Sequence, residues 1–309
     1  VVGAGALASG RFDVGELARF VAYLGWLSFL PRRAGRALAR YKQSAVAFGR
    51  MAGLVADGDP RNTVTDRSLP IGVGKSRERP EDRRPERTRL ERLDVVGLSA
   101  RYPSGAGVSD VSFTIARSEF VVVTGAVGAG KSTLLRALLG LAWQADVTGD
   151  VRWNGAQIED RGAFLVPPNA AFLPQVPQLI SDSVADNIAF GRLGRERVER
   201  AAALAVLDDD IAEMPDGIHT MIGPRGLRLS GGQRQRLAGA RAIVHAPELV
   251  VHDDLSSALD VETELRLWQN LADAGMTVIA VSHRAVAFDR ADRVLRLEGG
   301  RLVADAIVG

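Results

Sequence analysis

From about residue 93 onward, short apolar runs alternate with segments whose apolar residues recur at helical spacing. The runs are rich in β-branched residues, which is typical of buried strands. Because helical patterns separate these runs, we predict a parallel β-sheet with helices on its faces. The expected strands cover residues 119–124, 248–252, 276–281 and 293–297, and the expected helices cover residues 134–141, 196–207, 233–244 and 262–274.

A different pattern occupies residues 14–30, where Leu, Phe, Tyr and Trp predominate and only Glu16 and Arg19 are charged. The uncharged part, residues 20–30, is short for a helix that crosses a membrane, so a buried helix of a soluble protein stays open. A secretory signal is disfavoured because no basic segment precedes the apolar run. The basic residues between positions 32 and 42 are typical of the cytoplasmic flank of a membrane helix.

The helical pattern continues to about Val55, and its character then changes. Between residues 57 and 92, prolines are scattered among arginine, glutamate and aspartate, which is typical of a solvated linker. We interpret this charge run as a linker rather than a binding patch. The predicted organisation is an N-terminal segment of residues 1–56, a linker of residues 57–92 and a folded domain of residues 93–309.

Composition narrows the function classes. The 309 residues include 39 Lys and Arg and 37 Asp and Glu, for a net charge of +2. This near-balance argues against sequence-blind binding to nucleic acid as the main role. Hydrophobic residues at 46% and charged residues at 25% exclude wholesale disorder. With no cysteine, disulfides, thiol chemistry and Cys-ligated zinc are excluded.

The most specific chemical motif follows the expected strand 119–124. Residues 125–132 fit the pattern G-x-x-x-x-G-K-[ST], in which small residues let backbone N–H groups surround a phosphate at a helix N-terminus. Lys131 is suited to the β- and γ-phosphates, and the Ser132 hydroxyl is suited to Mg²⁺. A second Gly-Lys-Ser, at residues 74–76, lacks the first glycine and a preceding strand, so we assign it to the linker. The expected phosphate-binding residues are Gly125, Ala126, Val127, Gly128, Ala129, Gly130, Lys131, Ser132 and Thr133.

Two further motifs restrict the choice among phosphate-binding folds. Leu229-Ser-Gly-Gly-Gln233 precedes an expected helix, and Asp253-Asp254 follows a buried strand. Taken with the phosphate loop, this set resembles the nucleotide-binding domain of the ATP-binding cassette (ABC) family over about residues 93–302. The resemblance implies an α/β fold of the P-loop NTPase type. Such a fold has an ABC ATPase core sheet, an antiparallel β subdomain and a helical signature subdomain, and it binds ATP and Mg²⁺.

The resemblance also assigns roles to single residues. Tyr102 resembles the aromatic residue that stacks on adenine, although a core tyrosine is the alternative. Gln175 resembles the glutamine that touches Mg²⁺ and the attacking water, and Asp253 the carboxylate that holds Mg²⁺. His283 resembles the histidine that contacts the γ-phosphate. The implied metal ligands are Ser132, Gln175 and Asp253, and the implied catalytic residues are Asp254, His283, Gln175 and Lys131.

In this family two domains pair head to tail, so that the phosphate loop of one chain and the signature of the other enclose each ATP. The resemblance therefore implies that Ser230, Gly231, Gly232 and Gln233 act on the ATP of a partner chain. It places Asp260 in a loop that communicates across the dimer. A single chain is expected to bind ATP and to hydrolyse it poorly.

Two positions depart from the family pattern. The usual general base, a glutamate, is replaced by Asp254, whose side chain is one carbon shorter. We therefore hypothesise that this chain's own ATP site is slow and that its signature completes a competent site on a different partner. Pro224 stands where exporter relatives commonly carry glutamate, in a loop that helps to couple the two domains to the membrane part.

The resemblance favours a membrane helix at about residues 14–31, followed by a cytoplasmic extension. The chain would be the C-terminal part of an exporter-type subunit with a fused permease, in a cell membrane, with its ATPase domain on the cytoplasmic side. Its expected partners are a second ABC subunit, the transmembrane domain and lipid, with no nucleic acid. The alternatives are a soluble ABC ATPase that acts on DNA or ribosomes, and a largely non-hydrolysing subunit of a heterodimeric transporter.

Overall fold

The computed structural model describes residues 14–52, 85–190, 193–223, 226, 229–254 and 259–308. The chain divides into two compact units, Val1–Ser76 and Arg77–Gly309. The described part of the first unit is a single helix, and the described part of the second contains all the β-strands.

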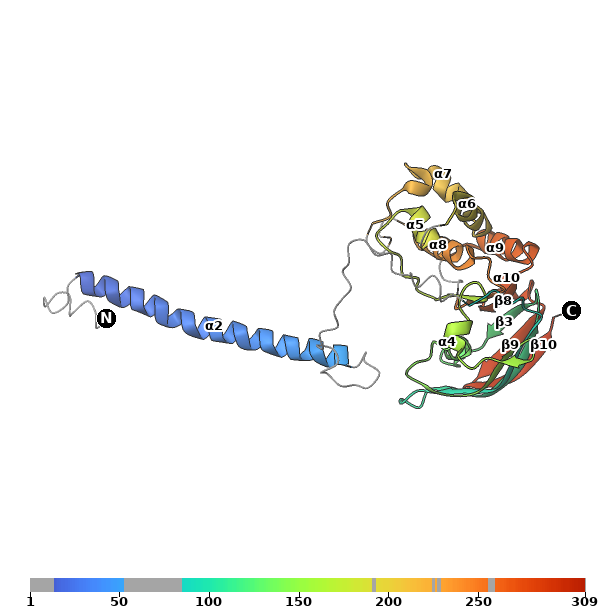
Figure 1. The fold of residues 1–309 in the computed structure, drawn as a ribbon, viewed down its shortest axis with the longest axis horizontal. Coiled ribbons are helices and arrows are strands. Elements are labelled where there is room, and N and C mark those ends of the chain that lie inside the picture. Colours follow the sequence, from blue (N-terminus) through green and yellow to red (C-terminus); the bar gives the residue numbers. More distant parts are fainter. Residues whose placement is uncertain are drawn as a thin grey trace. The chain divides into compact units, whose positions relative to one another are not determined.

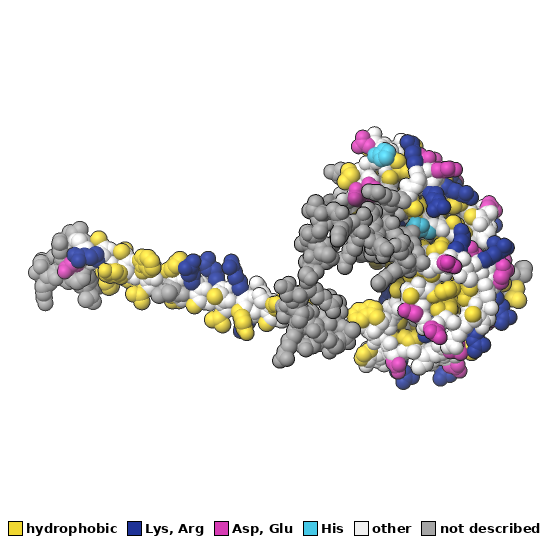
Figure 2. Space-filling view, viewed as in Figure 1, with side chains coloured by type: hydrophobic (Ala, Val, Ile, Leu, Met, Phe, Trp, Pro, Cys, Tyr) yellow, Lys and Arg dark blue, Asp and Glu magenta, His cyan; other side chains and the backbone are white. Residues whose placement is uncertain are grey.

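Helix α2 (Val14–Ala52) runs for 39 residues and includes Pro31. Exposed apolar side chains occupy its first half, and a group of basic side chains follows them (Figure 2). The guanidinium of Arg33 lies 5.0 Å from the centre of the Phe29 ring, in a cation–π contact. The uncharged stretch of α2 is bounded by Arg19 and Arg32, and no helix in the described ranges has the length and hydropathy needed to cross a membrane. The predicted helix at 14–31 is thus present, but its membrane span is not confirmed.

Two sheets form the second unit. The central sheet has six strands in the order β10-β9-β3-β8-β7-β6, and all adjacent pairs are parallel except β10 with β9. Its strands are β3 (Phe120–Thr124), β6 (Ala170–Leu173), β7 (Leu249–His252), β8 (Thr277–Val281), β9 (Arg293–Glu298) and β10 (Arg301–Ile307). The predicted parallel sheet and its four predicted strands are confirmed.

The second sheet is antiparallel, with the order β2-β1-β4-β5. Its strands are β1 (Arg92–Arg101), β2 (Gly107–Ala116), β4 (Asp146–Trp153) and β5 (Ala156–Gln157). This sheet is the antiparallel β subdomain that the family resemblance implied.

The helices lie on both faces of the central sheet, and α5 to α9 gather on one side of the strands (Figure 1). The four helices predicted from periodicity correspond to α3, α6, α8 and α9. The second unit contains α3 (Lys131–Leu138), α4 (Arg161–Phe164), α5 (Val184–Ala189), α6 (Arg195–Leu204), α7 (Asp208–Glu213), the 3₁₀ helix η3 (Gly217–His219), α8 (Gly231–Ile243), α9 (Val261–Asp273) and α10 (Ala285–Phe288).

The alternation of side chains along β3 separates two hydrophobic cores. Phe120 and Val122 point into the core that contains α5, α6, α8 and α9, whereas Val121 and Val123 point into the core shared with α3 and the antiparallel sheet. Successive strand residues face opposite sides of a sheet, so a strand buried on both faces is apolar throughout. The same topology brings the carboxyl ends of β3, β6, β7 and β8 to one edge, where ligands of parallel sheets bind.

The end of the predicted linker is packed rather than solvated. Leu90 is fully buried, Arg87 pairs with Glu248 at 2.8 Å, and the backbone N–H of Thr88 donates to Asn169 Oδ1 at 2.8 Å. The folded unit therefore begins a few residues before the predicted boundary at residue 93. The earlier linker residues, with the Gly-Lys-Ser at 74–76, lie outside the described residues.

Candidate functional site

A glycine-rich loop joins β3 to α3 and takes a backbone path that other residues rarely follow. Gly125, Gly128 and Gly130 have φ angles of 140°, 82° and 99°. A Cβ atom on Gly130 would lie 2.7 Å from Cγ1 of Val108, and one on Gly125 would lie 2.2 Å from the Leu297 carbonyl oxygen. Glycine at these two positions is required by backbone conformation and by space.

The start of α3 is open to an anion. Its N-cap, Gly130, makes no side-chain capping hydrogen bond, and the first N–H groups of a helix have no partner within the helix. Lys131 Nζ donates to the carbonyl oxygens of Gly125 at 2.7 Å and Ala126 at 2.9 Å. Burial lowers the pKa of Lys131, while the carboxylates of Asp254 and Asp253 oppose that shift. An ammonium and a helix N-terminus thus converge on one loop, an arrangement suited to phosphate.

A buried carboxylate lies beside this loop at the end of β7. Asp253 is 1% exposed, and its Oδ1 accepts a hydrogen bond from Ser132 Oγ at 2.8 Å. Its Oδ2 is buried and has no hydrogen-bond partner among the described atoms. An ionised oxygen in this state is costly unless a cation or a donor reaches it. The pair Ser132 and Asp253 therefore fits a divalent cation.

The donor set favours Mg²⁺ over a metal held by protein alone. In the part of the chain that the structure describes, no group of three or more His, Cys, Asp or Glu residues could enclose a metal. Mg²⁺ is commonly bound by one or two carboxylates, with water and substrate phosphates as its other ligands. The residues present fit that pattern, and the phosphate-binding loop adjoins them.

Gln175 and Asp254 meet at the same edge of the sheet. Gln175 Nε2 donates to Asp254 Oδ2 at 3.3 Å, and Asp254 has a left-handed backbone with φ of 54°. Gln235, on α8, donates from Nε2 to the Gln175 carbonyl oxygen at 2.8 Å. The loop that carries Gln175 is thereby attached to the helix that follows the signature motif.

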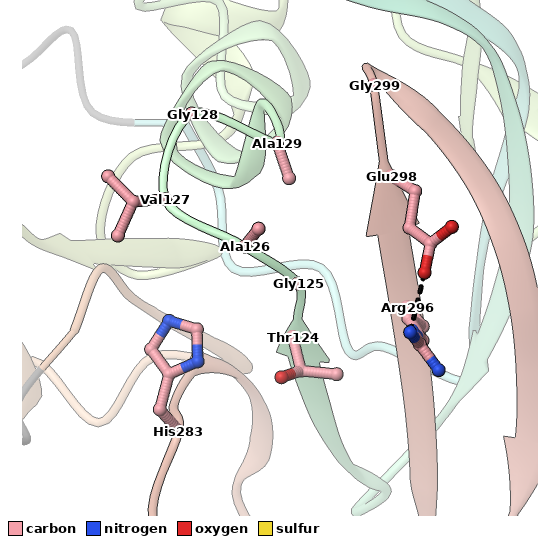
Figure 3. Close-up of a pocket in the computed structure, with 10 residues that line it drawn as sticks. All are labelled: Thr124, Gly125, Ala126, Val127, Gly128, Ala129, His283, Arg296, Glu298 and Gly299. Atoms are coloured by element: carbon pink, nitrogen blue, oxygen red, sulfur yellow. Dashed lines mark ion pairs between the residues drawn. The ribbon is translucent and has the colours of Figure 1, made fainter.

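Two cavities flank the phosphate loop. The larger, of about 950 Å³, lies between the loop and β9, where Arg296 and Glu298 form an ion pair at 2.6 Å (Figure 3). The smaller, of about 390 Å³, contains the groups suited to nucleotide chemistry. His283 lines both cavities. The smaller cavity is lined by Ala106, Gly107, Val127, Gly128, Gly130, Lys131, Ser132, Thr133, Gln175, Asp253, Asp254, Val281 and His283.

A second histidine lies behind the carboxylates. His252 is 2% exposed, and neither of its ring nitrogens has a partner in the described ranges. Burial lowers the pKa of His252 to about 3, so the ring is neutral at physiological pH. It packs edge-on against Trp268, with 5.9 Å between ring centres. His252 is therefore a packing residue beneath Asp253, whereas His283 is exposed at the cavity.

The signature motif begins α8, and none of its residues lines this cavity. Ser230 is the N-cap, and its Oγ accepts from the Gln233 backbone N–H at 3.2 Å. Gln233 Oε1 accepts in return from the Ser230 backbone N–H at 2.9 Å, which completes a capping box. Ser230 and Gly231 are exposed. Their exposed face is available to a ligand from outside the chain.

Comparison with known proteins supports the interpretation of the motifs. Residues 108–257 match the family described as ABC transporter. The "ATP-dependent lipid A-core flippase" of Burkholderia pseudomallei (strain 1710b) is 40% identical over 199 residues, which cover 63% of this chain and 33% of the flippase. The human "ATP-binding cassette sub-family B member 6" is 36% identical over 224 residues, covering 71% of this chain and 26% of that protein.

The chain carries an ABC transporter ATP-binding domain. A solved structure, "Structure of a bacterial Atm1-family ABC exporter with ATP bound", is similar with a TM-score of 0.65 and 31% identity, over 72% of this chain and 40% of that one. The chain spans between a quarter and a third of the length of the two curated relatives named above. The family match confirms the α/β fold class and the ABC resemblance.

The structure brings most of the predicted site residues of this ABC domain together. Ten of the residues predicted to bind phosphate or metal or to act in catalysis line one cavity: Val127, Gly128, Gly130, Lys131, Ser132, Thr133, Gln175, Asp253, Asp254 and His283. Tyr102 is half-buried and does not line that cavity, although Ala106 and Gly107, at the start of β2, do. Asp260 caps α9 by accepting from the Thr263 backbone N–H at 2.9 Å. Pro224 and residues 255–258 lie outside the described residues.

Sequence reasoning missed one buried ion pair behind the site. Glu264 is fully buried on α9 and accepts from Arg284 Nη1 at 2.9 Å, and the same nitrogen donates to the Leu259 carbonyl oxygen at 2.7 Å. Arg284 directly follows His283, so this pair connects the histidine loop to the start of α9. Glu264 shares a helical stripe with Leu267, and an acid on an apolar stripe is a signal that a buried partner exists.

Proposed function

We propose that this chain is the ATP-driven part of an exporter-type ABC transporter whose permease is fused N-terminally. The observation that carries the proposal is the single cavity that Lys131, Ser132, Asp253, Gln175 and Asp254 line together. Flippase and exporter relatives support it, because they share this domain as one part of longer proteins.

In the proposed reaction, the phosphate loop and Lys131 hold the β- and γ-phosphates of ATP. Ser132 and Asp253 would hold Mg²⁺, which when bound would neutralise charge on the transferring phosphoryl group. Asp254 orients or deprotonates the attacking water, and Gln175 fixes the Asp254 carboxylate through its hydrogen bond of 3.3 Å. His283 lines the cavity from the loop after β8, where it would contact the γ-phosphate. Catalysis of this kind depends mainly on positioning and electrostatics.

The second half of each site comes from a partner ABC subunit in a head-to-tail dimer. Ser230, Gly231, Gly232 and Gln233 lie at the start of α8 and do not line their own chain's phosphate cavity. A helix N-terminus attracts phosphate, and Ser230 Oγ, which accepts from Gln233, keeps its proton free to donate to the partner's nucleotide. Asp260, at the start of α9, would communicate between the two sites.

The membrane domain is the proposed partner of an apolar groove beside Gln175. The groove, of about 380 Å³, is lined by Pro174, Pro177 and Arg241, among others. Arg241 Nη1 donates to the Gln178 carbonyl oxygen at 2.7 Å, and its guanidinium lies 5.3 Å from the centre of the exposed Phe190 ring. Apolar side chains that stay exposed beside a nucleotide loop suit a partner surface. A displacement of this groove would move Gln175, because its neighbour in sequence, Pro174, lines the groove.

We place the protein in a cell membrane, with the ATP-binding domain on the cytoplasmic side. The basic group on α2 after residue 31 has the charge expected of a cytoplasmic flank. Fractionation of the full-length product tests this placement. Recovery in the membrane fraction after a high-salt wash is expected. Recovery in the soluble fraction would contradict the transporter and favour an ATPase that acts on DNA or ribosomes.

Asp254 favours a second candidate function, a largely non-hydrolysing subunit of a heterodimer. Its side chain is shorter than glutamate by one carbon, about 1.5 Å. Because a misplacement of about 1 Å costs on the order of 100-fold in rate, this chain's own site would be slow. A partner chain with glutamate at the equivalent position would then carry most of the hydrolysis.

Single-turnover hydrolysis of radiolabelled ATP distinguishes these two candidates. We expect Asp254→Glu to raise the rate constant by about 10-fold or more, by restoring the reach of the carboxylate. Asp254→Asn is the matched control and should lower the rate, since it removes the base without shortening the side chain. An unchanged rate in Asp254→Glu would show that reach does not limit this site.

A further inference from the structure

An acidic residue on α7 holds the first turn of the signature helix. Asp210 Oδ1 accepts from Gln233 Nε2 at 3.1 Å, and Asp210 Oδ2 accepts from Arg236 Nε at 2.9 Å and Nη2 at 2.6 Å. The side chains of Asp210 and Arg236 are 15% and 13% exposed. Charge-assisted hydrogen bonds at this burial are stronger than those at an open surface.

The Asp210 carboxylate fixes which way the Gln233 amide points. An ionised carboxylate accepts hydrogen bonds only, so it selects the NH₂ end of the amide. The Gln233 Oε1 atom is then left to accept from the Ser230 backbone N–H, as observed at 2.9 Å. A reversed amide would place an oxygen against a carboxylate and an NH₂ group against an N–H. Asp210 therefore determines the geometry of the capping box around Ser230.

Arg236 keeps this arrangement compatible with a phosphate nearby. The first turn of α8 contains no acidic residue. Asp210 brings a negative charge to that turn, and Arg236 neutralises it through two hydrogen bonds to one oxygen. The helix N-terminus thus keeps its attraction for an anion, while the carboxylate orients Gln233.

The neighbouring residue on α7 makes a weaker contact with another element. Asp209 Oδ2 lies 3.5 Å from Arg266 Nη1 on α9, and the Asp209 side chain is 80% exposed. An ion pair this exposed contributes little to stability. Asp209 and Asp210 share a residue type and a helix, but only Asp210 contacts the signature residues.

We propose that Asp210 is a positioning residue for the signature motif and acts, through Gln233 and Ser230, on the ATP held by the partner chain. The proposal rests on the head-to-tail dimer of the proposed function. It predicts that loss of Asp210 lowers hydrolysis without weakening the binding of ATP to the same chain's phosphate loop.

The first experiment compares Asp210→Ala with the matched control Asp209→Ala in the full chain. We expect kcat to fall about 10-fold in Asp210→Ala, which is part of the effect of misplacing a catalytic donor. The dissociation constant for ATP should stay within about 2-fold, since the phosphate cavity is elsewhere. Asp210→Glu should recover part of the rate, and Asp209→Ala should match the parent chain. A kcat of Asp210→Ala equal to that of the control would overturn the proposal, as would an equal loss of ATP binding.

The second experiment tests whether the effect acts in trans. Ser230→Ala chains are mixed with Lys131→Ala chains, so that only the mixed dimer has a working site, with the phosphate loop of the first and the signature of the second. Asp210→Ala added to the Lys131→Ala chain should lower the mixed activity about 10-fold. Added to the Ser230→Ala chain, it should change the activity by less than about 2-fold.

The outcomes distinguish the positioning role of Asp210 from the head-to-tail dimer on which it depends. If the loss follows the chain that supplies the phosphate loop, Asp210 does not act through the signature. If Asp210→Ala has no effect in either chain, the positioning role is wrong although the dimer stands. If the mixture without Asp210→Ala gives no more hydrolysis than either chain alone, the head-to-tail dimer of two copies of this chain fails, and the proposed role of Asp210 fails with it.

Discussion

Two helices of this domain begin at glycine-rich motifs, and their first turns are built in opposite ways. Helix α3 starts at Gly130 in a left-handed conformation without a side-chain cap. Helix α8 starts at Ser230 with a complete capping box, to which Asp210 adds a third hydrogen-bonded residue. The first turn of α3 has no side-chain cap, whereas in α8 the Ser230 side chain pairs with the Gln233 N–H and the Gln233 side chain pairs with the Ser230 N–H.

This difference indicates how each motif meets phosphate. The first turn of α3 depends on a ligand to complete its hydrogen bonds, so ATP binding should stabilise it. The first turn of α8 is formed before any ligand arrives and presents the Ser230 hydroxyl outward. A preorganised donor suits a site completed only when two chains meet.

The largest expected effect concerns ATP binding at the start of α3, the helix without a side-chain cap. Lys131→Ala should weaken ATP binding by about 100-fold, or about 2.7 kcal/mol, because it removes a charge from the phosphate site. The matched control is Lys75→Ala, in the Gly-Lys-Ser that we assign to the linker, and it should leave affinity unchanged. Isothermal titration of each chain with ATP and Mg²⁺ measures both. Equal affinities in the two variants would show that Lys131 does not contribute to phosphate binding.

The next effect concerns the stability of the backbone at the start of α3. Gly130→Ala should lower the free energy of unfolding by about 2 kcal/mol more than Gly128→Ala. Both glycines have left-handed φ angles, but only at Gly130 would the new Cβ meet another atom, Val108 Cγ1 at 2.7 Å. Urea unfolding without nucleotide measures the difference. If the two variants are equally stable, the loop relaxes and the space around Gly130 does not constrain it.

The smallest expected change in the free energy of unfolding comes from removing a helix N-cap. It distinguishes the capping role of Ser230 from its role in ATP hydrolysis. Ser230→Ala and Ser183→Ala each remove an N-cap, that of α8 and that of α5, and each should cost about 1 kcal/mol of stability. Only Ser230→Ala should also lower ATP hydrolysis, while ATP binding to its own chain stays unchanged. Hydrolysis and urea unfolding are measured on both variants. If Ser183→Ala impairs hydrolysis as strongly, the defect of Ser230→Ala comes from lost stability alone.

Much of this domain follows from local pattern. The phosphate loop, the strand before it and the helix after it are contiguous, so the motif at residues 125–132 determines its own structure. The parallel sheet follows from the alternation of apolar runs and helices. The convergence of Asp253 and His283 follows from parallel strand ends at one edge.

What could not be predicted depends on contacts between distant segments. Asp210 and Gln233 are 23 residues apart, and Arg284 and Glu264 are 20 apart. No local pattern specifies either pair, because only tertiary packing brings their helices and loops together. The predicted membrane helix is a different case: the pattern at residues 14–31 predicts a helix correctly, but the uncharged stretch, residues 20–31, is shorter than the roughly 17–25 residues that a membrane span needs.

The central claim is that each ATP is enclosed by the phosphate loop of one chain and the signature of another. Mixing Ser230→Ala chains with Lys131→Ala chains in equal amounts, and measuring ATP hydrolysis, tests it most directly. Half of the dimers are mixed and each has one working site, so the account predicts about a quarter of the unmodified chain's activity. Hydrolysis no greater than that of either variant alone would contradict the account.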